Sequence, residues 1–236
     1  MNTLDTGWRM PAEWTPHAAT WMAFPHNRML WESEWGVSLA DVQQDFAAVA
    51  NAIARFEPVK LVVDPAALDR AGELCAGNVE LIELAIDDSW CRDSGPSFVC
   101  HPQLGLAGVS WRFNAWGGKS AYAQDASLAR RILDGLGLEL ALDARGRRFE
   151  LIELFDAGEV APEEGVFCAS YTNFYIANGA IIMPAYGVAA DDAAAATLAR
   201  AFPAREVVPV RIDHLAHGGG GVHCITQQQP AWPARR

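Results

Sequence analysis

One cysteine, Cys224, follows four consecutive glycines in the segment HLAHGGGGVHCITQQQP (214–230). Glycine lacks a Cβ, so the backbone of Gly218–Gly221 can adopt positive φ angles and lie directly against a ligand. Four glycines lose much conformational entropy on folding, and a site where backbone N–H groups touch a substrate is one reason to keep them. Val222 and Ile225 extend the pattern of a strand through Cys224. The segment indicates a nucleophilic cysteine, and the alternative is a loose loop before a buried structural cysteine.

A second group of reactive side chains lies in the loop DDSWCRDSGP (87–96), which holds three carboxylates, an indole and a guanidinium. Loops at strand ends often carry the sites of α/β proteins. A carboxylate accepts two parallel N–H bonds from a guanidinium, and an indole offers its face to a cation. An aspartate of this loop together with Trp90 would therefore suit a guanidine ligand. The alternative is a surface turn in which Arg92 pairs with its acidic neighbours and Trp90 packs into the core.

Helical and extended patterns alternate along the chain and would position these two loops. Apolar spacing predicts helices over 38–56, 66–76, 121–136 and 191–202, the first with Ser38 and Asp41 resembling a capping box. Short apolar or β-branched runs predict strands at 59–63, 79–86, 106–113, 149–155, 171–176, 180–183 and 207–212. The Asn178-Gly179 pair is typical of a tight hairpin. The order strand, strand, helix, strand in the second half indicates a repetitive α/β architecture.

Composition narrows the class of protein. The 236 residues, 51% of them hydrophobic, can bury the core of one large or two small domains. The sequence has no run of 18 apolar residues and no signal-peptide pattern at its start, so we expect a cytoplasmic protein without a membrane partner. Five cysteines without paired spacing fit a reducing compartment. The net charge of −11 disfavours nucleic acid and would attract a small cation.

Five long motifs run through the chain. They are PAEWTPHAATWMAFPHN (11–27), DDSWCRDSGPSFV (87–99), WRFNAWGGK (111–119), NFYIANGAIIMPAYG (173–187) and GGGGVHCITQQQP (218–230), and they resemble the agmatine deiminases. They occur in collinear order over nearly the whole chain, so together they are far more specific than any one motif. The resemblance implies a guanidine-modifying enzyme with the pentein fold, an α/β propeller of five ββαβ-type units around a central site.

The resemblance also implies an activity, the hydrolysis of agmatine to N-carbamoylputrescine and ammonia, a step of polyamine and putrescine biosynthesis that uses no cofactor and no metal. Cys224 aligns with the family nucleophile, which forms a thiouronium intermediate. Asp93 aligns with a carboxylate that binds the guanidinium, and Trp90 with a tryptophan of the substrate pocket. Gly220 and Gly221 are expected to contact the substrate, and a homodimer is a further expectation.

The sequence departs from this family near residues 138–143. Family members carry a Glu-Gly-Gly motif and a His-x-Asp/Glu motif between the segments that correspond to 121–136 and 143–150, and this chain has neither. We therefore expect a single domain over 1–236 whose propeller is incomplete. His223 adjoins the nucleophile, but adjacent side chains of a strand point to opposite faces, so it is a poor replacement base. Little turnover is expected as a result.

Two other functions compete with this one. A chain that has lost two of five repeats would expose sheet edges and core, which fits a catalytically inactive remnant or an interaction protein. Alternatively, His214, His217, His223 and Cys224 offer ligands of the kinds that zinc prefers. A glycine run does not fix ligand geometry as a helix would, which disfavours the metal site.

Overall fold

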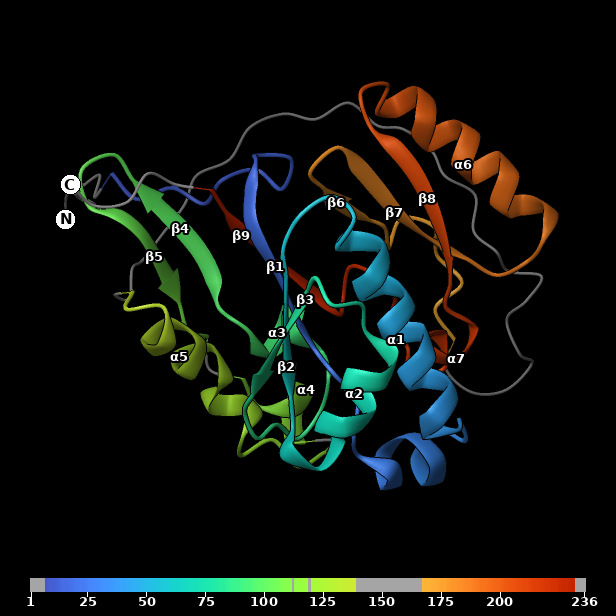
Figure 1. The fold of residues 1–236 in the computed structure, drawn as a ribbon, viewed down its shortest axis with the longest axis horizontal. Coiled ribbons are helices and arrows are strands. Elements are labelled where there is room, and N and C mark those ends of the chain that lie inside the picture. Colours follow the sequence, from blue (N-terminus) through green and yellow to red (C-terminus); the bar gives the residue numbers. More distant parts are fainter. Residues whose placement is uncertain (1–6, 112, 119, 139–166, 232–236) are drawn as a thin grey trace.

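A sheet of four strands forms the centre of the computed structural model, which describes residues 7–111, 113–118, 120–138 and 167–231 (Figure 1). Its strand order is β3-β2-β1-β9, where β1 is His17–Ala23, β2 Val59–Val63, β3 Val79–Glu83 and β9 Thr226–Pro230. The first three strands are parallel, and β9 runs antiparallel to β1. Because β1 and β9 pair, the two ends of the described chain meet in one sheet. The strand expected at 149–155 lies outside the described residues, and so does the expected junction at 138–143 except for residue 138.

The second sheet confirms the order strand, strand, helix, strand. Its strands are β6 (Tyr175–Ala177), β7 (Ala180–Ala185) and β8 (Glu206–Arg211), with α6 (Ala189–Ala201) lying along β7 and β8 (Figure 1). The turn at Asn178-Gly179 joins β6 to β7 as the sequence predicted, with Gly179 at a φ of 81°. Glycine reaches this left-handed region without steric cost, which explains its place in the turn.

A third, two-stranded sheet follows the acidic loop. Its strands β4 (Ser97–His101) and β5 (Gly105–Val109) form a hairpin that packs on α5 (Asp125–Gly135) (Figure 1). We did not predict β4, and the expected strand at 106–113 ends four residues early. The backbone of Gly108 approaches Leu133 of α5 so closely that a Cβ there would meet Leu133 Cδ1 at 2.9 Å. Packing between the hairpin and the helix therefore depends on this glycine.

Helix α1 (Leu39–Ile53) lies between the four-stranded and the three-stranded sheet and contacts β2, β7 and β8 (Figure 1). Ser38 caps it, accepting a hydrogen bond from the backbone N–H of Asp41 at 3.4 Å. Its predicted apolar stripe is buried. The remaining helical segments are the π-helical η1 (Met29–Glu34), the 3-10 helix η2 (Pro65–Ala67), α2 (Leu68–Leu74), α3 (Cys91–Ser94), α4 (Ala115–Gly118) and α7 (Asp213–Ala216).

A buried polar cluster joins the two larger sheets. Glu57 accepts hydrogen bonds from His17 of β1 at 2.9 Å and from the backbone N–H of Asn178 in the β6–β7 turn at 2.6 Å. The hydroxyl of Tyr175 lies 2.9 Å from that of Thr20. Because buried polar groups are costly unless paired, this network fixes how the sheets meet.

The mixed α/β class predicted from sequence is thus confirmed. Within the described ranges the strands form three separate sheets rather than a closed ring, and the incomplete propeller stays a prediction. None of the helices in those ranges is long and apolar enough to cross a membrane.

Candidate active site

A cavity of about 500 Å³ brings together most of the predicted site residues. Cys224, Asp93, Trp90 and Gly220 all line it, and Gly221 is not among the described residues that do. The other lining residues are Leu30, Glu34, Trp35, Trp116, Ser120, His217, Gly218 and Gly219. This volume is typical of a small-molecule site, which lies between about 300 and 1,000 Å³.

Cys224 lies in a turn before β9, so the prediction that residues 222–225 form extended chain is wrong. Its backbone N–H donates to the carbonyl of Gly221 at 3.1 Å, and the hydroxyl of Thr226 donates to that of Val222 at 2.9 Å. Pairing of β9 with β1 ends at Met22 opposite Thr226, although β1 continues to Ala23. Residues 222–225 form a turn instead of extending the pairing, and this turn directs Cys224 into the cavity.

The glycine run packs against aromatic side chains. A Cβ on Gly218 would lie 2.9 Å from both Trp31 and Trp90, and one on Gly220 would lie 2.8 Å from Trp90 Cη2 and closer still to Cζ3. Gly219 has a φ of 81°. The glycines are thus needed because the backbone passes over the indoles on its way to Cys224.

Asp93 lies on α3, the short helix that begins after Trp90. Burial raises the pKa of its carboxyl above the ordinary value, and a hydrogen bond from Trp116 and the positive charge of Arg92 partly oppose this. Of the three carboxylates in the loop, only Asp93 lines the cavity. Asp87 instead accepts from the backbone of Gln124 at 2.6 Å, at the start of α5.

Asp88 has a structural environment as well. It accepts a hydrogen bond from the N–H of Ser89 at 2.7 Å, and its own N–H donates to Asp125 of α5 at 2.9 Å. Burial raises the pKa of Asp88 to about 7, and that of Asp125 to about 6. These contacts tie the acidic loop to α5 and so hold α3 in place.

Arg92 connects α3 to the turn that carries the cysteine. Its backbone N–H donates to the carbonyl of Cys224 at 3.1 Å, and its guanidinium donates to the carbonyl of His223 at 3.3 Å and to Gln228 at 2.8 Å. Its ion pair is with Glu13 at 3.5 Å. The alternative in which Arg92 pairs with its own acidic neighbours is therefore wrong, whereas its other part, that Trp90 packs into the core, is confirmed. These bonds set the position of Cys224 relative to Asp93.

The three C-terminal histidines diverge, so the alternative zinc site is wrong. His214 binds Asp45 at 3.3 Å, and His223 turns away from the cavity to bind Glu13 at 3.0 Å. His217 lines the cavity, with its ring edge-on to Phe167 at 4.9 Å between centroids. Among the described residues no three potential metal ligands come together. His223 is poorly placed to act as a base for Cys224, as predicted. The reason differs, because His223 lies in a turn and pairs with Glu13 instead of pointing to the opposite face of a strand.

The indoles of Trp35 and Trp90 form a tilted pair 6.1 Å apart, backed by buried Trp31. Trp116, whose side chain donates a hydrogen bond to Asp93, has a positive φ of 50°. Trp35, Trp116 and Glu34 line the cavity but were not predicted as site residues. Glu34 adds a second carboxylate to it. Trp116 lies in the motif WRFNAWGGK (111–119), which is the one sequence feature that points to it.

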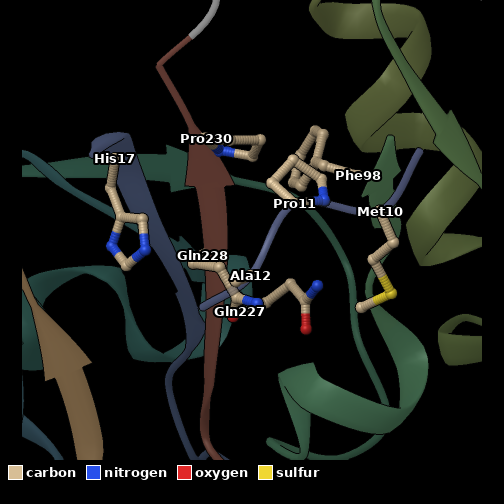
Figure 2. Close-up of a pocket in the computed structure, with 8 residues that line it drawn as sticks. All are labelled: Met10, Pro11, Ala12, His17, Phe98, Gln227, Gln228 and Pro230. Atoms are coloured by element: carbon tan, nitrogen blue, oxygen red, sulfur yellow. The ribbon is translucent and has the colours of Figure 1, made fainter. Parts of the chain in front are cut away.

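A second cavity, of about 10 Å³, lies beside β9 and has room for about one water molecule. Figure 2 shows Gln227 of β9 extending toward Met10, with His17 on the other side of the strand. Its lining consists of Met10, Pro11, Ala12, His17, Phe98, Gln227, Gln228 and Pro230. Among the described residues the lining includes no cysteine and no carboxylate, so it does not share the chemistry of the larger cavity.

The chain matches the model of one protein family, described as Porphyromonas-type peptidyl-arginine deiminase, in two pieces that cover residues 9–141 and 136–230. The chain belongs to this family of enzymes. The two pieces meet at 136–141, close to the expected deletion junction.

Relatives in this deiminase family include an agmatine deiminase of Pseudomonas aeruginosa, 28% identical over 95% of this chain and 96% of its own length. A relative from Streptomyces coelicolor is 29% identical over 94% of this chain and 98% of its own. The alignment with the Pseudomonas enzyme has 357 positions and this chain has 236 residues, so at least 121 positions have no counterpart here. The fold agrees with that of a solved agmatine deiminase of Enterococcus faecalis, with a TM-score of 0.82 and 21% sequence identity. The match covers 95% of this chain and 96% of the Enterococcus chain. The family predicted from the five motifs is thereby confirmed.

Proposed function

We propose that this chain binds agmatine in the 500 Å³ cavity and attacks its guanidinium carbon with Cys224. The observation that carries the proposal is that Cys224 and Asp93, 131 positions apart in sequence, line one cavity with an indole and the glycine run. Asp93 would accept the guanidinium N–H groups, and Trp90 would face the cation. Relatives that carry the agmatine deiminase name support the substrate class.

The charges of the cavity support agmatine over free arginine. Its described lining includes two carboxylates, Asp93 and Glu34, and no lysine or arginine. Agmatine carries a cation at each end, so both ends find an acidic partner. Arginine would bring an α-carboxylate toward the same acidic lining, where like charges repel.

The chemistry would proceed in two steps. The Cys224 thiolate forms a C–S bond to the guanidinium carbon. One amino group of this adduct takes up a proton and leaves as ammonia, giving an S-alkylthiouronium. Water then attacks the same carbon, the C–S bond breaks, and Cys224 departs as thiolate, leaving N-carbamoylputrescine. Both steps need proton transfers. Of the six histidines, His217 alone is among the described lining.

The proposal includes slow turnover. The chain lacks the family's His-x-Asp/Glu and Glu-Gly-Gly motifs, and we place their absence in a deletion near 138–143 within a single domain. Loss of a general base costs about a hundred- to ten-thousandfold in rate. The chain would then bind agmatine and form the thiouronium intermediate far faster than it completes a full catalytic cycle.

Calorimetry with agmatine tests the binding. Asp93→Asn should weaken affinity about ten- to a hundredfold, because a hydrogen bond to a charged partner contributes about 1.5–3 kcal/mol. Affinity of the unaltered chain should also fall as the pH drops through the raised pKa of Asp93. Asp134→Asn is the matched control, since Asp134 pairs with Arg130 on the exposed face of α5. Equal affinity of Asp93→Asn and Asp134→Asn for agmatine would place Asp93 in a purely structural role. If neither the unaltered chain nor either variant binds agmatine, the catalytically inactive remnant is favoured instead.

A further inference from the structure

We propose that Asn173 is the positioning residue of Cys224, holding its sulfur and favouring its thiolate form. This inference rests on the proposed function, which makes Cys224 the nucleophile. Asn173 lies just before β6, and its side-chain nitrogen Nδ2 is 3.3 Å from Cys224 Sγ. The same nitrogen is 3.7 Å from Cys168 Sγ.

The orientation of the Asn173 amide follows from its other contact. The backbone N–H of His223 donates to Asn173 Oδ1 at 2.8 Å and also to the Asn173 carbonyl at 3.1 Å. A backbone N–H is only a donor, so the atom facing it must be the amide oxygen. The amide NH₂ is thereby directed at the sulfurs. The neutral thiol can donate back to Oδ1 only at 3.8 Å.

Asn173 is also held in place by its surroundings. A Cβ on Gly221 would lie 2.8 Å from Asn173 Cγ, so the last glycine of the run packs its backbone directly on the amide. The N–H of Asn173 donates to the carbonyl of Ser170 at 3.2 Å. One side chain therefore touches the glycine run, the backbone before the cysteine and the sulfur itself. This arrangement explains why Gly221 contacts Asn173 instead of lining the cavity.

An N–H directed at sulfur stabilises the thiolate over the thiol, because hydrogen bonds are stronger to charged partners. Other charged or titratable groups around Cys224 are Asp93, Glu34 and His217 in the cavity, Arg92 behind the turn, and Cys168. Asn173 differs from them because it contacts the sulfur directly. It does not titrate, so its effect persists at every pH.

Asn173→Asp is the decisive variant. It keeps the shape and the oxygen that accepts from His223, but replaces the N–H groups facing Cys224 by a carboxylate oxygen. The measurement is the rate of Cys224 alkylation by iodoacetamide from pH 5 to pH 10, with the modified site located by peptide mapping. This probe is uncharged and does not depend on Asp93. We expect the rate at pH 7 to fall about ten- to a hundredfold and the profile to move to higher pH.

Asn51→Asp provides the matched control. Asn51 likewise accepts from a backbone N–H, that of Ala76 at 2.7 Å, and donates to a carbonyl, that of Leu74 at 3.0 Å, so neither of these partners is a sulfur. We expect its alkylation profile to equal that of the unaltered chain. A purely structural Asn173 would be rescued by the Asp substitution, so equal profiles for Asn173→Asp and Asn51→Asp would overturn the proposal.

A second measurement needs no folded variant of Asn173. In the unaltered chain, the NMR signals of the Asn173 side-chain amide should shift with the same pH midpoint as alkylation, and Cys224→Ser should abolish this shift. Amide signals that do not respond to pH would overturn the proposal. If Cys224 alkylation depends on Asn173 but agmatine neither binds nor modifies Cys224, the proposed function fails while the role of Asn173 stands. An unreactive Cys224 in the unaltered chain would overturn both.

Discussion

Replacement of Gly220 by alanine should distort the site in a way that the distances predict. The new Cβ would lie 2.8 Å from Trp90 Cη2, closer to Cζ3, and 3.2 Å from the Cβ of Cys224. Carbon atoms need about 3.5–4.0 Å. Trp90 cannot move aside easily, because it is only 5% exposed and packs against Trp31 and Trp35.

We therefore expect Gly220→Ala to lower the free energy of unfolding by about 1–3 kcal/mol, the usual cost of forcing extra volume into a packed region. For a chain of this size that corresponds to roughly 2–12 °C in Tm. Alkylation of Cys224 should slow as well, since the turn that holds it must shift. Urea and thermal unfolding measure the first effect, and peptide mapping after brief labelling measures the second.

Gly77→Ala is the control for this experiment. Nothing lies within 4 Å of a Cβ at Gly77, and its φ is not positive. There we expect no loss of stability, or a gain of about 0.4–1 kcal/mol from the less flexible unfolded chain. If Gly220→Ala is as stable as Gly77→Ala and labels Cys224 at the normal rate, the close approach of the glycine run to Trp90 is not a constraint, and our reasoning about the run is wrong.

Three further predictions concern the thiols, turnover and pH. A haloacetamidine should label Cys224 before the other cysteines. Burial raises the thiol pKa to about 11 in Cys75, about 12 in Cys91 and about 11 in Cys100. Preferential labelling of Cys91 would contradict this prediction. Ammonia release from agmatine should be negligible, and a turnover of about 1–100 per second would instead make His217→Asn the next variant. Asp88 has a folded pKa of about 7 against an unfolded value near 3.8, so the stability it contributes is present at low pH and lost as the pH rises through 7. The free energy of unfolding should fall by up to about 4 kcal/mol from this group between pH 4 and 8, and urea titrations of Asp88→Asn should show a smaller fall.

Local patterns in the sequence determined most of the regular elements. The stripe of α1, the run of β2 and the Asn178-Gly179 turn all occur where residue spacing and turn chemistry placed them. Such signals depend on near neighbours, so a single sequence contains them. The same holds for the family, because five long motifs in fixed order survive in the chain despite its missing segment.

Tertiary structure alone decided what each side chain of the two reactive loops contacts. Asp87, Asp88 and Asp93 have equal chemistry in sequence, yet their carboxylates differ in surroundings. That of Asp87 accepts from the backbone at the start of α5, that of Asp88 accepts from Ser89, and Asp93 lines the cavity. Arg92 could have paired with any of them and instead reaches Glu13 and Gln228, which the pairing of β1 with β9 brings near it.

The same limit applies to the cysteine. The pattern of residues 222–225 favours a strand, but the pairing of β9 with β1 ends at Met22 and these four residues form a turn. The resulting turn places Cys224 beside Asn173, 51 positions earlier in the chain. Residue types determined which groups could do chemistry here. Strand pairing and packing, which act between distant residues, decided which of them meet.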